Sequence, residues 1–556
     1  MKSNFKTALE EIWIEKFWVG SVSLLAGFFA LYLGAMILFH LGTPLTIWHS
    51  TLFILPVVGV CQLFLPGRHG LAVTGIVASA IFVIATIFMR FQDFSWDGMA
   101  VRQGCVESMV GGATPRSMCL PHVISGWLAI LCGSIPGGKG VNLIAGLAAF
   151  GCLLKLACRI RIPSGWNWVL PIAVTMNPVF IYQLNSFYID GFTSCLLVCL
   201  ACGFFLVYEK PLSHRRWLFL AVIIFLTAAS KPSGIVYCII YGSFFLGGLA
   251  ISKKWKPQYI LVWPLIGGIL MMIGLVSLKM QRGEVQSLYN FREFANLRTP
   301  GYGIGLGSFA PDSAAEMSKI EVFFRSHFAP TRTMSSEWEF KVPGWFARPE
   351  LALFQDLNPD PRSGGFGPLY GAVFLLAALA AGVTLVYSPR SFWVSWIPAL
   401  GLFVSCLLSQ AWWARWVPQA WLVPLALVAP VLIRTAGRVA GWLAKFSVTL
   451  ALLNSILILA FYTSGCFQNQ NILNQQLMFL KELPQPISVY VPTFPSNLTW
   501  MQEAGIPFVL LKKEPLFPRL TLQRTNTKVA LPDNWESLLP NSRVLPLWEK
   551  RRLIEK

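Results

Sequence analysis

The sequence predicts an all-α protein that crosses a membrane many times. Of its 556 residues, 55% are hydrophobic and only 12% are charged, and the mean hydropathy is +0.59. Soluble domains carry roughly 25% charged residues, so this chain lacks the polar side chains that several soluble domains need for their surfaces. Its 22 Trp residues fit the same class, because Trp is enriched at membrane–water interfaces. A soluble multidomain protein is therefore excluded.

The strong positive charge has an explanation within this class. The formal net charge is +19, from 44 Lys and Arg against 25 Asp and Glu. In a soluble chain this excess indicates nucleic acid as a partner, but the cytoplasmic loops of membrane proteins are rich in Lys and Arg for another reason. We therefore expect membrane lipid as a partner and no nucleic acid. The 12 cysteines show no CxxC…CxxC pattern and no Cys/His metal spacing, so no metal site is predicted.

About thirteen segments approach the roughly 20 apolar residues that a helix needs to cross the hydrocarbon. They lie near residues 17–40, 48–66, 71–89, 141–158, 166–184, 190–208, 216–230, 234–251, 259–279, 367–386, 392–410, 417–433 and 446–463. The first follows a charged lead without a small-residue cleavage site, which indicates a signal anchor. The shorter apolar segment 122–135 is expected to be a helix lying at the interface.

The distribution of Lys and Arg fixes the expected orientation. With the N-terminus in the cytoplasm, the short outer loops hold only Lys231 and Arg415. The inner loops hold Arg68, Lys155, Arg159, Arg161, Lys210, Arg215, Arg216, Lys253, Lys254, Lys256, Arg390, Arg434, Arg438 and Lys445. Three long segments, 90–121, 280–366 and 464–556, then face outward.

Two domains follow from this arrangement. Residues 1–463 form the transmembrane domain, whose outer loops 90–140 and 280–366 are expected to make up the active-site side. Residues 464–556 form an outward-facing C-terminal domain. Strand patterns at 487–491 and 508–511, with the helix-like NLTWMQEAG between them, predict that this tail is a small α/β appendage.

The first long outer loop collects ionisable side chains directly after a span. They are Arg90, Asp93, Asp97, Arg102 and Glu107. An ionisable residue at membrane depth costs roughly 2.5–3.5 kcal/mol, so each one calls for a reason. A carboxylate such as Asp97 has the chemistry of a general base toward a hydroxyl acceptor. The alternative is a solvated loop with scattered acids, and composition favours neither.

Two further charged residues stand at outer span ends. Asp190 lies where one span ends and the next begins, and the alternative to a functional role is an Asp-Gly turn. Lys231, in AASKPSG, is a lone cation against the positive-inside trend, which suits binding of an anionic headgroup or phosphate. Snorkelling of its ammonium to the interface is the competing explanation.

A last cluster, SQAWWARWVPQAW, contains Trp412, Arg415 and Gln419, and Arg362 precedes the span at 367. Interfacial belts place Trp at such ends in any case, whereas Arg suits phosphate recognition. Together the clusters place carboxylates and cations on one outer face of a helical bundle. The sequence contains no P-loop, GxSxG, HExxH or dinucleotide-binding GxGxxG in a strand–helix setting, which argues against ATP-driven and dinucleotide chemistry.

The chain resembles the GT-C glycosyltransferases, in particular the bacterial branch related to protein O-mannosyltransferases and lipid A aminoarabinose transferases. The motifs that carry the resemblance are WDGMAVRQGCV, NPVFIYQLNSFYIDG, SKPSG, GGFGPLYG and WWARWVPQAW, in this order over about residues 85–430. The resemblance implies a GT-C-like bundle in a bacterial inner membrane. It also implies transfer of a sugar from a polyprenyl-phosphate donor to a glycan, lipid or protein acceptor on the periplasmic face.

The resemblance also implies roles for individual residues. An Asp in the first outer loop is the catalytic base of such enzymes, and the matching position is Asp97, with Asp93 as the second choice. The residues expected to bind substrate are Arg90, Arg102, Asp190, Lys231, Arg362, Trp412, Arg415 and Gln419. Related sequences tend to read DGxxYH or DSLxYH, whereas this chain reads DGMAVR from Asp97. Some of these enzymes use a divalent metal and others do not, and no ligand set stands out here.

Other functions remain open from the sequence. An O-antigen ligase or polymerase would depend on outer-loop Arg and His, here His122 and His327, more than on Asp97. A transporter or flippase of a lipid-linked sugar would bind the same headgroup without forming a covalent product, and a non-catalytic relative is a third alternative. Cys105 and Cys119 both lie in the first outer loop, where either a disulfide or two reduced thiols are compatible with the sequence.

Overall fold

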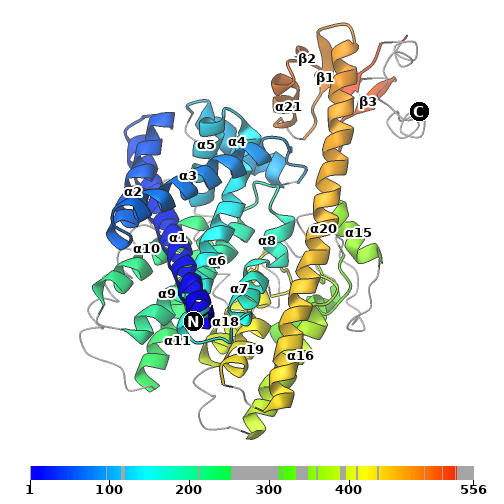
Figure 1. Cartoon of the computed structure of the whole chain (residues 1–556). Helices are drawn as coiled ribbons and strands as arrows, with labels where there is room; N and C mark the ends of the chain where they lie inside the picture. The colour runs from blue at the N-terminus through cyan, green and yellow to red at the C-terminus, as the bar shows by residue number, and fades with distance from the viewer. Residues whose placement is uncertain are drawn as a thin grey trace.

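A computed structural model of the chain describes residues 2–95, 97–113, 119–210, 213–251, 312–315, 317–332, 348–357, 361–387, 396–407, 411–434, 437–493, 495–515, 518–532 and 534. It is a helical bundle with a small sheet at one end of its longest helix (Figure 1). The predicted span 259–279 and most of the 280–366 loop lie outside the described residues.

Helices account for almost all of the regular structure in the first half of the chain. In order they are α1 (Lys2–His40), η1 (Ile47–His49), α2 (Ser50–Phe64), α3 (Arg68–Phe88), η2 (Gly98–Arg102), α4 (Gln103–Val110), α5 (Leu120–Cys132), η3 (Ile135–Gly140), α6 (Val141–Arg159), α7 (Trp166–Thr175), α8 (Pro178–Tyr182), α9 (Asp190–Glu209), α10 (His214–Ser230) and α11 (Pro232–Ile251). The predicted interfacial segment 122–135 is the helix α5, and most of its side chains are buried against the bundle.

The second half continues the bundle and then adds the sheet. Its elements are η5 (Asp312–Ala315), α14 (Lys319–His327), α15 (Arg348–Gln355), α16 (Tyr370–Tyr387), α18 (Ile397–Leu407), η7 (Pro418–Trp421), α19 (Leu422–Arg434), α20 (Arg438–Glu482), β1 (Ile487–Tyr490), α21 (Asn497–Glu503), β2 (Phe508–Leu510), β3 (Arg519–Thr521) and β4 (Lys528–Ala530). Helix α20 runs without a break through residue 463, where the sequence places the domain boundary, and that boundary stays a prediction.

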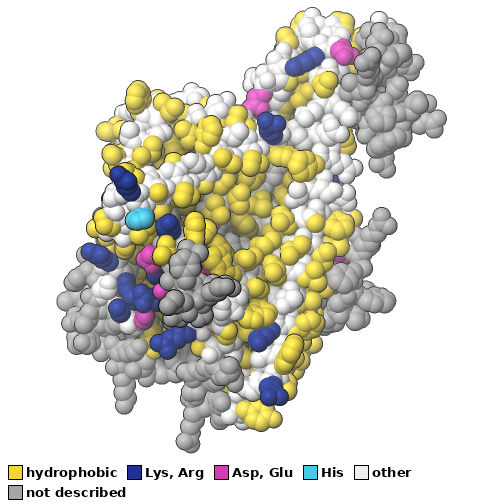
Figure 2. Space-filling model, viewed as in Figure 1, with side chains coloured by type: hydrophobic (Ala, Val, Ile, Leu, Met, Phe, Trp, Pro, Cys, Tyr) yellow, Lys and Arg dark blue, Asp and Glu magenta, His cyan; other side chains and the backbone are white. Residues whose placement is uncertain are grey.

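The helices confirm a membrane protein but not the predicted number of spans. Within the described residues, 7 helices are long and apolar enough to cross a membrane. They are Glu10–Phe39, Ile47–Phe64, Arg68–Phe88, Ile135–Arg159, Asp190–Glu209, Tyr370–Tyr387 and Arg438–Glu482. The predicted spans 392–410 and 417–433 contain shorter apolar helices. Hydrophobic side chains cover a broad area of the bundle, as expected of a surface that faces lipid (Figure 2).

Helix α9 forms the centre of the bundle. Of its apolar window, 83% is buried inside the protein, against 22% for the span that contains α2. It packs against α6, α8, α10 and α11, and α1 packs against both α6 and α10. Because α9 begins at Asp190, the acidic end of this largely buried helix is held in place by its neighbours on several sides.

The predicted span 166–184 is wrong as a single helix. It is divided into α7 and α8, because Pro178 follows Asn177 and a residue before proline avoids the helical region. Asn177 accordingly adopts φ −57°, ψ 130°, and its Oδ1 accepts a hydrogen bond from the Val179 N–H at 3.0 Å. Its Nδ2 donates to Ser194 Oγ at 3.0 Å and to the Pro418 carbonyl at 2.8 Å. The break is thereby tied to α9 and to η7.

The C-terminal appendage is the small α/β unit that the sequence predicts. Strands β1 and β2 and the intervening helix α21 coincide with the three predicted elements. Two strands that the sequence analysis did not predict, β3 and β4, complete a sheet of order β2-β1-β4-β3, in which β1 pairs parallel with β2 and antiparallel with β4. The hydrophobic core of the appendage includes Phe479 and Leu480, so the end of α20 is built into it.

The break at Asn177 leads to a stability prediction. Substituting Asn177→Ala removes the cap of α8 and leaves the buried Pro418 carbonyl without this donor, and a buried unsatisfied group costs about 1–3 kcal/mol. We expect a lower thermal unfolding midpoint for the purified protein in detergent, measured at one scan rate. The matched control is Asn471→Ala on the exposed face of α20, which should leave the midpoint unchanged. Equal midpoints for the two variants would contradict the role of Asn177.

Candidate functional site

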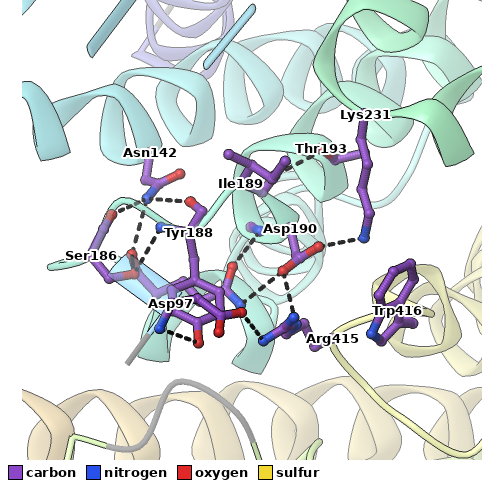
Figure 3. Close-up of polar contacts among 12 residues, drawn as sticks. Asp97, Asn142, Ser186, Tyr188, Ile189, Asp190, Thr193, Lys231, Arg415 and Trp416 are labelled. Atoms are coloured by element: carbon purple, nitrogen blue, oxygen red, sulfur yellow. Dashed lines mark hydrogen bonds and ion pairs between the residues drawn. The ribbon is translucent and has the colours of Figure 1, made fainter. Parts of the chain in front are cut away.

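Two carboxylates and two cations from distant parts of the sequence form one chain of ion pairs (Figure 3). Lys231 Nζ lies 2.5 Å from Asp190 Oδ1, and Arg415 Nε lies 3.5 Å from Asp190 Oδ2. Arg415 also pairs with Asp97, with 2.9 Å between Arg415 Nη1 and Asp97 Oδ2. The Asp190 side chain is 5% exposed, whereas that of Asp97 is 34% exposed. Asp97 is therefore the member of the chain most accessible to a substrate.

Aromatic rings flank both cations. The guanidinium carbon of Arg415 lies 4.9 Å from the Tyr188 ring centre and 5.0 Å from that of Trp413. Lys231 Nζ lies 4.1 Å from the ring centre of Trp416, as Figure 3 shows. A cation at these distances from a ring face is attracted to it, more strongly where water is excluded. The rings therefore stabilise the charged forms of both cations without adding a negative charge.

The motif SKPSG explains how Lys231 reaches Asp190. Pro232 forces the preceding residue out of the helical region, and Lys231 adopts φ −163°, ψ 147°, so α10 ends at Ser230 and α11 begins at Pro232. A Cβ on Gly234 would lie only 2.0 Å from the Thr227 carbonyl oxygen, so glycine is needed where the two helices meet. Burial lowers the pKa of Lys231, Asp190 opposes that shift, and Arg415 and Arg102 add to it.

The loop before Asp190 is held by buried polar side chains. Asn142 Nδ2 donates to the carbonyls of Gln183, Ser186 and Tyr188 at 3.0–3.3 Å. Gln183 Oε1 accepts from the Gly191 N–H at 2.8 Å. Asp190 also stands in the first turn of α9, where the helix dipole favours a negative charge. The loop is thus a fixed support for both Asp190 and the Tyr188 ring.

Asp93 and Asp97, the two candidate bases, occupy different environments. Asp93 is buried, and its carboxylate accepts hydrogen bonds from the Ser95 N–H at 2.8 Å, the Ser95 hydroxyl at 2.5 Å and the Phe187 N–H at 2.7 Å. Burial raises its pKa, while Lys139 and these hydrogen bonds oppose the rise. Asp93 thereby joins the first long loop to the loop before Asp190.

Asp97 stands at the start of a tight turn. The next residues form η2, a single π-helical turn, a feature frequently found at functional sites. A Cβ on Gly98 would lie 2.1 Å from Asp93 Oδ2 and 2.2 Å from Ser95 Oγ, so only glycine lets the turn pack on the Asp93 carboxylate. The Asp97 N–H donates to the Tyr188 hydroxyl at 3.3 Å. The position of Asp97 is therefore set by Asp93, Gly98 and Tyr188.

The other predicted site residues are distributed around this chain of ion pairs. Arg102, at the end of η2, is close enough for its charge to act on Asp190 and Lys231. Arg362 lies 5.9 Å from the Trp413 ring centre. Arg90 is exposed at the end of α3, and among the described residues it has no side-chain partner. The roles of these three arginines in substrate binding stay predictions.

Trp412 and Gln419 are buried rather than open to a substrate. Trp412 is stacked on Trp413, with 5.0 Å between ring centres, in a hydrophobic cluster with Val322 of α14. Gln419, in η7, is fully buried, and neither its Nε2 nor its Oε1 has a hydrogen-bond partner among the described residues. Trp412 therefore helps to pack the loop that carries Arg415 against α14. Binding of substrate by these two residues stays a prediction.

The histidine and cysteine side chains that the sequence places near the site are buried or partly buried. His327 Nε2 donates to the Ala411 carbonyl at 2.7 Å, and burial lowers its pKa to about 3, so the ring is neutral near pH 7. His122 is buried, with Nδ1 3.0 Å from Cys119 Sγ. No disulfide joins Cys105 to Cys119. Among the described residues no group of three or more His, Cys, Asp or Glu side chains is placed to hold a metal ion.

Tyr188 and Trp416 were not among the predicted site residues. Tyr188 contacts both Asp97 and Arg415, and it lies two residues before Asp190 in a motif that the sequence analysis selected for the acid alone. Trp416 follows Arg415 directly, but a Trp at a span end is ordinary in a membrane protein. Only the folded arrangement shows that these two rings face cations.

No family model and no curated protein matches the chain. Among solved structures, two crystal structures of ArnT from Cupriavidus metallidurans align with it, one in the apo state and one bound to undecaprenyl phosphate. Both are 11% identical to this chain, with a TM-score of 0.37. The apo alignment covers 80% of this chain and 86% of ArnT, and the lipid-bound one 81% and 87%. A function for this chain therefore has to be sought in its own residues.

The buried ion pairs lead to a second stability prediction. Asp190→Asn leaves Lys231 buried without its carboxylate, and breaking a buried pair by removing one partner costs about 3–5 kcal/mol. We expect a clear fall in the thermal unfolding midpoint in detergent. The double variant Asp190→Asn/Lys231→Gln should recover part of the loss, because the uncompensated ammonium is gone.

Glu514→Gln is the matched control for this prediction. Glu514 pairs with Arg519 and Lys528 in the appendage, but its side chain is 43% exposed. Exposed pairs contribute about 0–1 kcal/mol, so the midpoint should hardly change. If Asp190→Asn had as small an effect as Glu514→Gln, the ion-pair chain would not stabilise the bundle.

Proposed function

We propose that this protein is an integral-membrane glycosyltransferase of the GT-C type, which moves a sugar from a polyprenyl-phosphate donor to an acceptor on the periplasmic face. The observation that carries the proposal is the ion-pair chain Asp97–Arg415–Asp190–Lys231, in which an accessible carboxylate stands beside two largely buried cations. The motif order that resembles GT-C enzymes supports it independently. In this proposal the N-terminus is cytoplasmic, the C-terminal appendage is periplasmic and the membrane is a bacterial inner membrane.

The charges of the site suit a lipid-linked phosphate. The four members of the chain sum to zero, and Arg102 nearby adds a positive charge. A phosphate that enters can therefore replace the more exposed carboxylate, Asp97, as the partner of Arg415, while Asp190 keeps Lys231 in place. Arg is well suited to this exchange, because its guanidinium binds carboxylate and phosphate with the same planar geometry.

This exchange couples donor binding to activation of the base. In the ion-pair chain Asp97 Oδ2 contacts Arg415 Nη1 at 2.9 Å, so this oxygen is not open to an acceptor hydroxyl. When the donor phosphate replaces Asp97 as the partner of Arg415, Asp97 becomes free to accept a proton. In this proposal the Asp97 oxygen is open to the acceptor only when a donor is bound.

The reaction is a single displacement at the anomeric carbon. Asp97 takes the proton of the acceptor hydroxyl as its oxygen forms the new bond to the anomeric carbon. The bond from that carbon to the phosphate oxygen breaks, and the electron pair leaves with the polyprenyl phosphate. Arg415 and Lys231 offset the negative charge that develops there.

The histidines give the ligase alternative little support. His327 and His122 are both buried, and burial keeps the His327 ring neutral near pH 7, so neither ring is exposed to an incoming glycan. Asp97, in contrast, is partly exposed beside Arg415. Compared with the two histidines, Asp97 is the more accessible candidate, which favours base-assisted transfer.

Replacing Asp97→Asn tests the proposed base. Because an amide does not accept the proton, transfer from radiolabelled polyprenyl-phosphate sugars to a membrane acceptor extract should fall about 10²–10⁴-fold. The matched control is Asp356→Asn, which removes an exposed carboxylate that pairs with Arg524, and it should transfer at the wild-type rate.

The same assay separates the alternatives. Equal transfer by wild type and Asp97→Asn would remove Asp97 from the mechanism and favour a ligase-like enzyme. An absence of transfer by the wild type, with the donor lipid still bound, would contradict the transferase and favour a transporter of lipid-linked sugars or a non-catalytic protein.

Replacing Arg415→Gln tests the phosphate site. A hydrogen bond to a charged group contributes about 1.5–3 kcal/mol, so the dissociation constant for undecaprenyl phosphate should rise roughly 10- to 100-fold. Binding can be measured by native mass spectrometry of the protein in detergent. The control Arg216→Gln removes an Arg that pairs with Glu209 at 2.8 Å, away from the site, and should bind normally. Equal affinities would exclude Arg415 as a phosphate ligand.

A further inference from the structure

The C-terminal appendage touches the loop that carries Asp97. Although the two segments are far apart in sequence, helix α21 lies beside the segment from Gln92 to Glu107. Figure 1 shows α21 beside the end of the bundle that includes α4 and α5. The rings of Phe94 and Trp500 meet edge to face, with 5.6 Å between their centres. The appendage is therefore part of the surroundings of the candidate site.

One contact falls within the turn that follows Asp97. The Ser496 hydroxyl donates to the Met99 carbonyl at 2.6 Å, and both residues are buried. Met99 is the second residue of η2 and lies two residues after Asp97. A π-helical turn is rare and is usually a single turn inside other helical structure. An added hydrogen bond to its backbone therefore helps to fix the conformation of the turn.

Further hydrogen bonds hold the same two segments together. Gln103 Nε2 donates to the Ser496 carbonyl at 3.3 Å and to Glu107 Oε1 at 2.8 Å. The same Glu107 oxygen accepts from the Thr499 hydroxyl at 2.6 Å. Before the turn, Gln92 Nε2 donates to Glu503 Oε2 at 3.1 Å. The appendage thus contacts the Asp97 loop on both sides of the acid.

The appendage in turn is fixed to the bundle by α20. Phe479 and Leu480 of α20 belong to its hydrophobic core. Gln476 of α20 donates to the Thr521 carbonyl at 3.0 Å and accepts from the Gln523 N–H at 2.7 Å. A helix of 45 residues that begins in the bundle and ends in the appendage leaves little freedom between them. Ser496 is consequently held in a defined place relative to the Arg415 side of the site.

We propose that Ser496 is a positioning residue, through which the C-terminal appendage sets the Asp97 turn so that the carboxylate faces Arg415 and the acceptor. The proposal rests on the proposed function for its catalytic consequence, but not for the contact itself. Ser496 does not touch the reacting atoms, and it acts through the Met99 carbonyl on the orientation of Asp97. Removal of the hydroxyl is expected to loosen the turn rather than to unfold the bundle.

Hydrogen–deuterium exchange of the full-length protein in detergent tests the contact directly. In Ser496→Ala, amides of residues 98–103 should exchange at least several-fold faster than in wild type. The matched control is Thr525→Val, which removes a hydroxyl whose partners among the described residues are the Leu522 carbonyl and the Thr527 N–H, both in the appendage. Unchanged exchange at 98–103 in Ser496→Ala, or equal acceleration in the control, would overturn the proposal.

Transfer kinetics test the consequence by a double-mutant cycle. Ser496→Ala should lower kcat about tenfold with little change in the KM for the donor, and Ser496→Thr, which keeps the hydroxyl, should restore most of the rate. In the Asp97→Asn background, Ser496→Ala should have no further effect, because the group it orients is absent. An undiminished effect in that background would show that Ser496 acts independently of Asp97 and would overturn the proposal.

The two experiments separate failure of this inference from failure of the proposed function. If wild type transfers no sugar, the transferase proposal fails, but exchange at residues 98–103 still decides whether Ser496 fixes the turn. If wild type transfers sugar and Ser496→Ala matches it in both exchange and rate, the transferase stands and the positioning role is excluded.

Discussion

The arrangement of this bundle depends on the buried carboxylate of Asp190, which holds two cations at once. Lys231 and Arg415 come from different parts of the chain, and both reach Asp190 at the start of α9, the most buried of the candidate spans among the described residues. In a medium of low polarity a charge is tolerated only when it is paired. Because these charges must be paired, the link between α10 and α11, which carries Lys231, and the turn before η7, which carries Arg415, both lie beside Asp190. Asp97 then completes the chain on its accessible side.

Much of this site was predictable because charged residues are scarce in the sequence. Asp97, Asp190, Lys231 and Arg415 each stand at the end of an apolar run, and an ionisable residue there requires a partner or a function. The structure brings all four together. The membrane class and the three predicted elements of the appendage followed from hydropathy and alternation in the same way. These features depend on local composition, which a sequence displays directly.

Other features depend on contacts that composition does not reveal. The resemblance ranks Asp97 above Asp93 as the base, but only the structure shows that Asp93 is buried between two loops and that Asp97 faces Arg415. The Asn177-Pro178 pair carried a local signal for a helix break, but the continuous apolar run concealed it. The contact between Ser496 and Met99 joins residues 397 positions apart. Neither segment has a sequence pattern that predicts a contact with the other. Buried polar contacts of this kind determine which loops lie side by side. They can be identified only from the folded structure.

The exchange of partners at Arg415 is the central claim, and a cryo-EM structure of the protein in nanodiscs with undecaprenyl phosphate tests it most directly. We expect the phosphate to lie within hydrogen-bonding distance of Arg415, with the Asp97–Arg415 pair opened and the Asp190–Lys231 pair intact. A phosphate bound elsewhere, with Asp97 still 2.9 Å from Arg415, would contradict the account.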